Sequence, residues 1–184
     1  MSRDIWVISD THLMHENILK FKDNNTGNFV RGHLFSNVDE MNEHILDKWN
    51  SVVKQGDIVY HLGDVFIGDK EKFKKIWPKF HGRKRLIVGN HDTIDWISSG
   101  NFFQKVQMWR MFPEFGLVLS HVPLHESNLL RLVDRKGKYP DDCITLKNLH
   151  GHIHQNPSPE GPYQNMSVEA INYTPMNIDE LRIM

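Results

Sequence analysis

Aspartate, asparagine and histidine side chains directly follow several short apolar runs of this sequence. In residues 86–92, the run Leu-Ile-Val passes into Gly-Asn-His-Asp. The same pattern recurs in four other places, at Asp10 and His12, at Asp64, at His121, and at His152 and His154. Because ligands of open α/β sheets bind outside the carboxyl ends of the strands, we expect these side chains to share one site. Carboxylate, amide and imidazole donors without thiolate suit divalent ions such as Mn, Fe, Zn or Ni.

Each of these residues taken singly has a simpler explanation. An aspartate at a strand end usually forms a turn or caps a helix, and a histidine beside apolar residues usually makes a structural hydrogen bond. The ordered series is the informative feature, because Asp-x-His, Gly-Asp, Gly-Asn-His-Asp, Ser-His and Gly-His-x-His each follow an apolar segment. Random placement would rarely produce that series.

The series resembles the calcineurin-like metallophosphoesterase superfamily, and more closely its small single-domain predicted phosphoesterases of bacteria and phages. The segments 9–12, 60–65 and 167–169 carry the likeness together with His15, Asn17 and residues 172–173. The resemblance covers essentially the whole chain. It implies an α/β fold, a four-layer α/β/β/α sandwich of two mixed sheets, with the site at the carboxyl ends of the inner strands.

The resemblance also implies two sets of metal ligands: Asp10, His12, Asp64 and His154 for one ion, and Asp64, Asn90, His121 and His152 for a second. Asp64 would bridge the two ions. Two divalent ions roughly 3.5–4 Å apart can clamp an in-line phosphoryl displacement and lower the pKa of a shared water. We therefore expect a hydroxide between the ions to attack phosphorus. Mn²⁺ is the expected metal, mainly on the family likeness, with Fe, Zn or Ni as alternatives.

His91 has the family position of a proton donor, next to the expected ligand Asn90. An imidazole near its ordinary pKa of about 6.5 can protonate a leaving alkoxide. In the phosphoprotein phosphatases, an aspartate three residues after the bridging aspartate orients this histidine. Ile67 stands at that place here, so another carboxylate must orient His91 if it is the acid. Asp92 is expected to be structural, as a helix cap.

Three further residues are candidates for contact with substrate. His15 and Asn17 follow the first ligand pair closely enough to touch a substrate phosphate. Arg31 lies in a turn-rich loop, residues 23–36, that could fold over the site, although a solvated loop arginine is the simpler interpretation. Asp57 stands before its strand rather than after it, which favours a structural role.

The elements that must position these residues follow from the apolar patterns. Strands are expected at 5–8, 58–62, 86–88, 105–111 and 115–120, with a closing strand at 166–171. Asn37 and Glu40 have capping-box spacing and should begin a helix that runs to about residue 52. Asp69 should cap a second helix that Pro78 ends. All five tryptophans are expected in or near the core.

The bulk composition narrows the class of protein. The 184 residues fit a single metallophosphoesterase domain, residues 1–184, with 39% hydrophobic and 24% charged residues. With a formal net charge of −1, the protein has no overall positive charge that would attract nucleic acid or a membrane surface. A single cysteine excludes an internal disulfide framework and suits a reducing compartment. No signal-like or membrane-spanning apolar run is evident, so we expect a cytoplasmic protein.

Three functional hypotheses remain at this stage. The leading one is a dinuclear phosphoesterase that cleaves a mono- or diester in a small molecule or nucleotide. A nuclease would use the same chemistry, but near-neutral charge argues against strong binding to a phosphate backbone. A non-catalytic protein-binding scaffold would be expected to have lost ligands, whereas all seven positions hold competent ones. The substrate and the oligomeric state are not encoded in the ligand residues, because loops 23–36 and 122–147 shape what enters.

Overall fold

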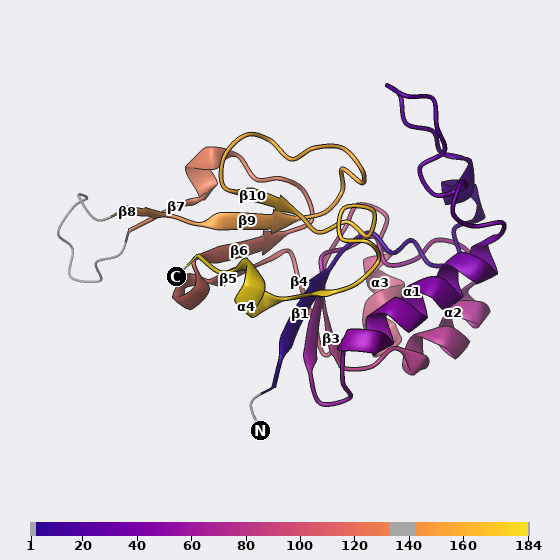
Figure 1. Ribbon diagram of the computed structural model, residues 1–184. Coiled ribbons are helices and arrows are strands. Elements are labelled where there is room, and N and C mark those ends of the chain that lie inside the picture. The colour runs from indigo at the N-terminus through magenta and orange to yellow at the C-terminus, as the bar shows by residue number, and fades with distance from the viewer. Residues whose placement is uncertain (1–2, 133–142, 184) are drawn as a thin grey trace.

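The computed structural model describes residues 3–132 and 143–183 of the chain. Its main strands form two mixed sheets that pack face to face, and the longer helices cover the outer face of the first sheet (Figure 1). This arrangement confirms the predicted fold class. The middle of the loop predicted at 122–147 falls in residues 133–142, outside the described residues.

The first sheet has the strand order β11-β1-β2-β3-β4. Its strands are β1 (Ile5–Ile8), β2 (Ile58–His61), β3 (Arg83–Ile87), β4 (Lys105–Gln107) and β11 (Met176–Asn177). Strands β1 to β4 run parallel, and β11 is antiparallel to β1. Ile8 pairs with His61, which pairs with Leu86, so β1, β2 and β3 end at the same edge of the sheet.

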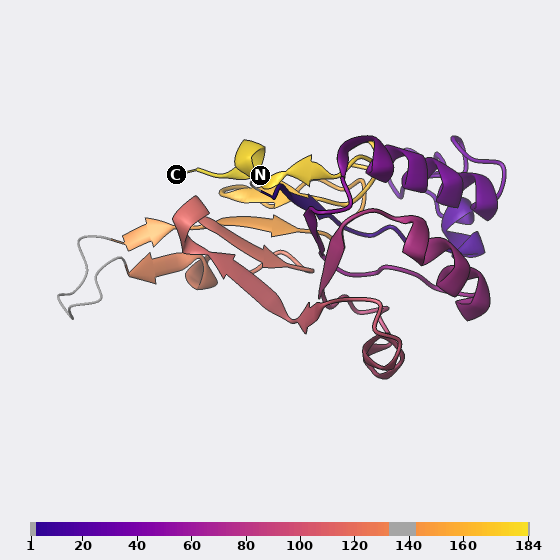
Figure 2. The same ribbon diagram turned by 90° about the horizontal axis from the view of Figure 1, so that it is seen from below.

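The second sheet has the strand order β10-β9-β6-β5. Its strands are β5 (Trp109–Phe112), β6 (Leu117–Ser120), β9 (Lys147–His150) and β10 (Tyr163–Asn165). Strands β6, β9 and β10 run parallel, and β5 is antiparallel to β6. Ser9, just after β1, pairs in parallel with Ser167, just after β10. This bridge brings the carboxyl ends of the two sheets together (Figure 2). A separate hairpin joins β7 (Leu130–Leu132) to β8 (Cys143–Thr145).

The predicted helix starts are confirmed in detail. Helix α1 (Val38–Val52) begins after Asn37, whose side chain accepts a hydrogen bond from the Glu40 backbone N–H. Helix α2 (Lys70–Ile76) begins after Asp69, which accepts hydrogen bonds from two backbone N–H groups. These caps satisfy amide groups that a helix start leaves without partners. The remaining helices are α3 (Ile94–Ser99), α4 (Ile178–Leu181) and the 3-10 turns η1 (Glu16–Lys20), η2 (Trp77–Lys79), η3 (Pro113–Phe115) and η4 (Glu126–Asn128).

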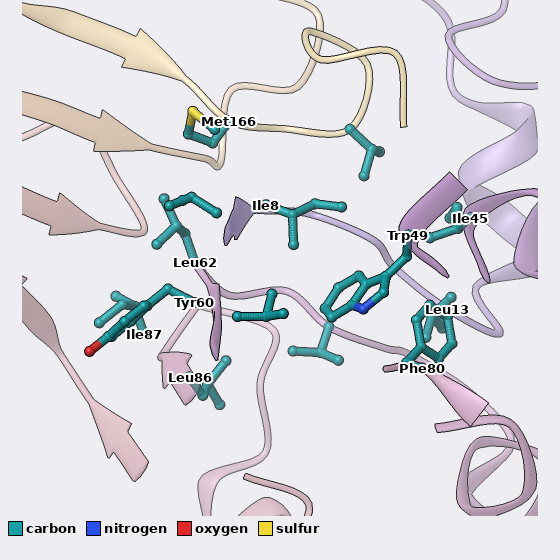
Figure 3. Close-up of a cluster of buried hydrophobic side chains, with 14 of the residues drawn as sticks. Ile8, Leu13, Ile45, Trp49, Tyr60, Leu62, Phe80, Leu86, Ile87 and Met166 are labelled. Carbon is teal, nitrogen blue, oxygen red and sulfur yellow. The ribbon is translucent and has the colours of Figure 1, made fainter. Parts of the chain in front are cut away.

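Two apolar clusters hold the layers together. In the larger cluster, Tyr60 and Met166 lie between the sheets, while Trp49 packs on the helix side of the first sheet (Figure 3). The Tyr60 ring meets Phe112 of the second sheet at 5.3 Å between centroids. The smaller cluster consists of Val118, Leu129 and Leu146. Val118 alternates along β6 with Leu117 and Leu119 of the larger cluster, so the smaller cluster covers the opposite, outer face of the second sheet.

The single strand predicted at 105–111 is wrong, because the chain changes sheets there. Strand β4 pairs with β3 in the first sheet, and β5 pairs with β6 in the second, with a break at Met108. Met108 is 68% exposed at this break, and Trp109 is 62% exposed, so the predicted position of Trp109 in or near the core is also wrong. The local apolar pattern cannot reveal that the chain passes from one sheet to the other, because the residues on both sides of the break have the pattern of a strand.

The closing strand predicted at 166–171 is also wrong. Only Ser167 makes a bridge within this segment, and a turn follows in which the backbone N–H groups of Ala170 and Ile171 donate to Ser167 O. Strand β10 takes its place in the second sheet, three residues earlier. Within the described part of the chain, no helix has the length and apolar character needed to cross a membrane.

Candidate metal centre

The seven residues predicted as metal ligands come together from both sheets. Those from the first sheet follow β1, β2 and β3, and those from the second follow β6 and β9. Two sets of ligand atoms each fit within 4.8 Å. The first ligand group consists of Asp10, His12 and His154, and the second of Asp64, His121 and His152.

Asp64 lies between the two ligand groups. Its Oδ2 is 3.6 Å from His12 Nε2 and 3.5 Å from His121 Nε2. Its Oδ1 accepts a hydrogen bond of 2.9 Å from the His91 backbone N–H, which holds the carboxylate in this orientation. One oxygen of Asp64 therefore faces both groups, as a bridging ligand would.

Asn90 belongs with the second ligand group. Its Oδ1 is 2.8 Å from His121 Nε2 and 2.9 Å from His152 Nδ1, and these two nitrogens are 3.2 Å apart. The three donor atoms thus form a compact triangle beside Asp64. An amide oxygen adds a ligand without adding charge to a site that already holds a carboxylate.

Several buried ligand atoms of the first ligand group have no hydrogen-bond partner in the part of the chain that the structure describes. Asp10 Oδ2 accepts hydrogen bonds from the His152 backbone N–H and the Ser167 hydroxyl, at 2.9 and 3.0 Å. Asp10 Oδ1 and both ring nitrogens of His12 are buried, and the described residues provide no hydrogen-bond partner for them. Buried polar atoms are normally satisfied, so unpaired ones call for an explanation. A divalent cation satisfies carboxylate and imidazole donors at once, and the residues present therefore fit a metal ion.

The backbone at the site is largely left-handed. The φ angles of Asp10, His12, Asp64, His152 and His154 lie between 46° and 71°. Residues other than glycine seldom adopt this region, and they do so where the surrounding structure imposes it, often at functional sites. Five of the seven predicted ligands share this conformation, which turns each side chain sharply away from its strand.

Two glycines of the sequence motifs have a steric role beside the ligands. A Cβ atom at Gly89 would lie 2.3 Å from Asp64 Oδ1, and one at Gly151 would lie 2.2 Å from Asp10 Oδ2. A side chain at either position would therefore displace a carboxylate of the site. This contact explains why Gly precedes both Asn-His-Asp and His-x-His.

Hydrogen bonds set the tautomers of two histidines. His121 Nδ1 is 2.8 Å from Leu62 O, and His154 Nδ1 is 3.0 Å from Glu169 Oε1. Because both partners are acceptors, each Nδ1 carries the hydrogen, and Nε2 is left to face the site. Burial lowers the pKa of His12 and His152, which favours the neutral rings that bind metals.

Glu169 and Arg31 form a buried ion pair behind His154. Burial alone would raise the pKa of Glu169, but the Arg31 charge and the hydrogen bond from His154 outweigh it and lower that pKa to about 2. Burial also opposes a charged His154, yet its hydrogen bond to Glu169 raises the pKa of His154 overall. The expectation that Arg31 is a solvated loop residue is wrong, because its side chain is 0% exposed.

The predicted proton donor His91 is exposed at the rim of the site. Its ring lies 5.8 Å from that of His12, between centroids. Among residues 3–132 and 143–183, no carboxylate hydrogen-bonds to the His91 ring. Ile67 stands where the phosphoprotein phosphatases have the orienting aspartate, and this part of the chain provides no other carboxylate for that role.

Asp92 is structural, but it is not a helix cap. Its two oxygens accept hydrogen bonds from the backbone N–H groups of Asp64, Val65 and Gly89 at 2.8–3.0 Å. The cap position of α3 is Thr93. Asp92 thus ties the loop after β3 to the loop after β2. Asp57 is structural as expected, since it accepts from the Trp6 indole N–H and the Lys54 backbone N–H.

Two pockets flank the site on either side of η1. One of about 350 Å³ is lined by His15 and Asn17, with Lys72 across from them. His15 Nδ1 is buried with no hydrogen-bond partner among residues 3–132 and 143–183, and the His15 ring lies 5.6 Å from that of His12, between centroids. The other, of about 500 Å³, is bounded by His152 and His154 together with the segment 18–24. Both predicted phosphate-contacting residues therefore line a pocket next to the ligands.

Sequence reasoning missed the role of Glu169. It lies 138 positions from Arg31 along the chain, so no local spacing relates the two. A signal was present nonetheless: Glu169 is an acid within the apolar run 166–171. A buried acid in such a run needs a cationic or hydrogen-bonding partner.

Comparisons with known proteins agree with this arrangement. Residues 3–178 match the family model of the calcineurin-like phosphoesterases. The uncharacterized protein MJ1445 of Methanocaldococcus jannaschii is 32% identical over 190 residues, which cover 96% of this chain and 88% of that protein. The gene 66 protein of Mycobacterium phage L5 is 33% identical over 170 residues, or 81% of this chain and 76% of that protein.

A solved structure extends the similarity to three dimensions. The crystal structure of the protein of unknown function AQ665 from Aquifex aeolicus is similar with a TM-score of 0.67 and 26% identity, and the match covers 98% of both chains. The family match spans nearly all of the described fold, and the motif residues converge at one place within it. The chain therefore belongs to the calcineurin-like phosphoesterase family.

Proposed function

We propose that this protein is a dinuclear metal-dependent phosphoesterase that hydrolyses a phosphate mono- or diester of a small molecule or nucleotide. The observation that carries the proposal is the position of Asp64 Oδ2, within 3.6 Å of a ring nitrogen in each ligand group. A carboxylate shared between two sets of N and O donors is the arrangement needed to hold two cations close together.

The residues of the chain would divide the work as follows. The first ligand group would hold one ion, and the second, with Asn90, would hold the other, with Asp64 common to both. When bound, two divalent ions supply Lewis-acid charge for the phosphoryl oxygens and a nucleophile at neutral pH. His91, exposed beside His12, is suited to deliver a proton to the leaving oxygen. His15, which lines the smaller pocket beside His12, is suited to donate from its ring to a non-bridging phosphate oxygen.

The larger pocket supports a small organic ester as the substrate. Its volume of about 500 Å³ is within the usual range for small-molecule sites. Lys20 and Lys22 line it with no carboxylate among the lining residues, although the whole chain has a net charge of −1. Phe21 is 49% exposed and presents an aromatic ring beside them. Such a lining suits an anionic group that carries a planar ring, as a nucleotide does.

Hydrolysis of a panel of esters tests the proposal. Metal-free protein would be assayed with chromogenic mono- and diesters and with nucleotides, after addition of Mn²⁺, Fe²⁺, Zn²⁺ or Ni²⁺. We expect metal-dependent turnover, and we expect Asp64→Asn to reduce it by more than the roughly 10–100-fold that loss of an outer partner costs.

Asp95→Asn is the matched control, because Asp95 is an exposed acid on α3. It should leave turnover unchanged. Failure to cleave any ester, together with failure to bind any of the four metals, would refute the proposal.

A further inference from the structure

We propose that Glu169 is a positioning residue, which holds His154 with Nε2 toward the first ligand group while Arg31 holds Glu169 in place. The inference rests on the metal centre proposed above, and it adds two residues that touch neither the substrate nor a metal. The Arg31–Glu169 pair would make the orientation of His154 depend on an arginine of the loop 23–36.

The contacts of Glu169 carry the first step. Its Oε1 accepts hydrogen bonds from His154 Nδ1 at 3.0 Å and from Arg31 Nε at 2.7 Å, and it lies in an ion pair 2.7 Å from Arg31 Nη2. The Glu169 side chain is 5% exposed, so these contacts are shielded from water. A carboxylate that accepts from the far nitrogen of a ligating histidine fixes its ring orientation and strengthens it as a ligand.

The contacts of Arg31 carry the second step. Beyond Glu169, its guanidinium donates to the backbone carbonyls of Asp10 and Thr11, at 2.6 and 3.0 Å, and to Met41 Sδ. All three guanidinium nitrogens therefore donate within the protein, which argues against the predicted contact between Arg31 and substrate. The same side chain supports the left-handed segment that carries Asp10 and His12. Arg31 thus supports Asp10 and His12 through their backbone segment, and it supports His154 through Glu169.

The second ligand group provides an internal comparison. His121 is oriented by a backbone carbonyl, Leu62 O, at 2.8 Å. No part of that contact involves Glu169 or Arg31. Loss of the Glu169 charge should therefore affect the first ligand group and spare the second.

Metal binding, rather than activity, gives the direct test. Calorimetric titration of metal-free protein with Mn²⁺ should show two binding events in the wild type. In Glu169→Gln, which keeps the shape of the side chain, we expect one event to weaken by about 10–100-fold and the other to stay unchanged. Electron paramagnetic resonance of protein with two equivalents of Mn²⁺ should then change from a spin-coupled pair to isolated ions.

Two further variants separate positioning from general stability. Glu160→Gln removes an exposed acid of the loop before β10 and should bind both ions as the wild type does. Arg31→Lys keeps the charge but loses the forked contact, and it should weaken the same event as Glu169→Gln. Circular dichroism at the titration temperature confirms that each variant is folded.

The outcomes distinguish this inference from the proposed function. If the wild type binds two ions and folded Glu169→Gln binds both as tightly, or loses both equally, the positioning role of Glu169 is refuted and the metal centre stands. If the wild type binds no ion, the metal centre itself is refuted and this inference falls with it.

Discussion

The left-handed residues of the candidate metal centre need support from individual hydrogen bonds. A non-glycine residue in this region costs about 1–3 kcal/mol. The backbone N–H groups of Asp10 and His12 donate to Gly63 O and Asp64 O, both at 3.0 Å, and that of His152 donates to Asp10 Oδ2. Each of these bonds joins one predicted ligand to the segment that carries another. The segments that carry the predicted ligands are therefore held together by their own hydrogen bonds, without a bound ion.

A change at Phe21 should alter which esters are preferred. Base–aromatic stacking is worth about 1–3 kcal/mol, and Phe21 offers its ring to the larger pocket. We expect Phe21→Ala to raise KM for nucleotide esters on the order of 10-fold, and to leave KM for methyl phosphate unchanged. Steady-state kinetics with both substrates measures this difference.

Leu34→Ala is the control for that experiment. Leu34 is also exposed, at 52%, but it does not line the larger pocket. A Phe21→Ala variant with the same KM change for both substrates would contradict ring recognition at this pocket.

Single residues also show where sequence reasoning succeeds and where it ends. The strand-end positions of Asp10, Asp64 and Asn90 could be predicted, because polar residues interrupt apolar runs at those points. The burial of Arg31 could not, since its partner Glu169 is brought to it by the pairing of Ser9 with Ser167. The sequence around a charged residue in a turn-rich loop does not indicate that a distant acid will pair with it in the protein interior.

The loops after the strands are the elements that build the site. Asp92 fastens the loop after β3 to the loop after β2 through three backbone N–H groups. Gly151 N–H donates to His121 O at 2.8 Å, which fastens the loop after β9 to the end of β6. These hydrogen bonds fix the positions of the loops relative to one another. They also explain why the ligands meet although they belong to separate strands.

A methyl group at Gly151 should disrupt the first ligand group. The added Cβ would lie 2.0 Å from Ser9 Oγ and 2.2 Å from Asp10 Oδ2, so the loop after β9 must shift. We expect Gly151→Ala to lose metal-dependent activity and to lower the melting temperature. Gly56→Ala serves for comparison, because nothing lies within 4 Å of the Cβ added there, and it should match the wild type. Wild-type metal affinity in Gly151→Ala would show that this close approach has no functional role.

Element boundaries could be predicted where the signal is local. Asn37 and Asp69 are caps whose partners lie within three residues, and both were located correctly. The break at Met108 depends instead on which sheet each half joins, and this is decided by β3 and β6. Likewise, Met166, Val168 and Ile171 are buried in the larger apolar cluster although the segment 166–171 does not form a strand. Long-range pairing therefore accounts for both errors.

At the scale of the whole molecule, one buried histidine should make stability depend on pH. The Thr11 hydroxyl donates to Val65 O and so accepts from His61 Nε2 at 2.9 Å, while Gly63 N–H donates to His61 Nδ1. These partners suit the neutral ring. Burial lowers the pKa of His61 to about 3, whereas the unfolded chain has the ordinary value of about 6.5.

The direction of the pH effect follows from which state binds the proton. Between pH of about 6.5 and about 3, the unfolded chain binds a proton at His61 and the folded protein does not, so stability falls as pH falls. The contribution of one such group is at most about 1.4 kcal/mol per pH unit. His61→Gln keeps a donor for Thr11 but does not titrate, so its free energy of unfolding should fall less between pH 7 and pH 5. Urea unfolding of metal-free protein at both pH values measures this difference. An equal fall in the free energy of unfolding for the wild type and for His61→Gln would show that His61 does not cause the pH dependence.

The ligand set is divided between the two sheets, and this division has a consequence for exchange with the surroundings. Asp10, His12, Asp64 and Asn90 follow strands of one layer, while His121, His152 and His154 follow strands of the other. An ion held there would be bound by ligands from both layers at once, and it would leave only when both sets of ligands release it. The rate at which a chelator removes the metal should therefore rise in variants that weaken the packing between the two sheets.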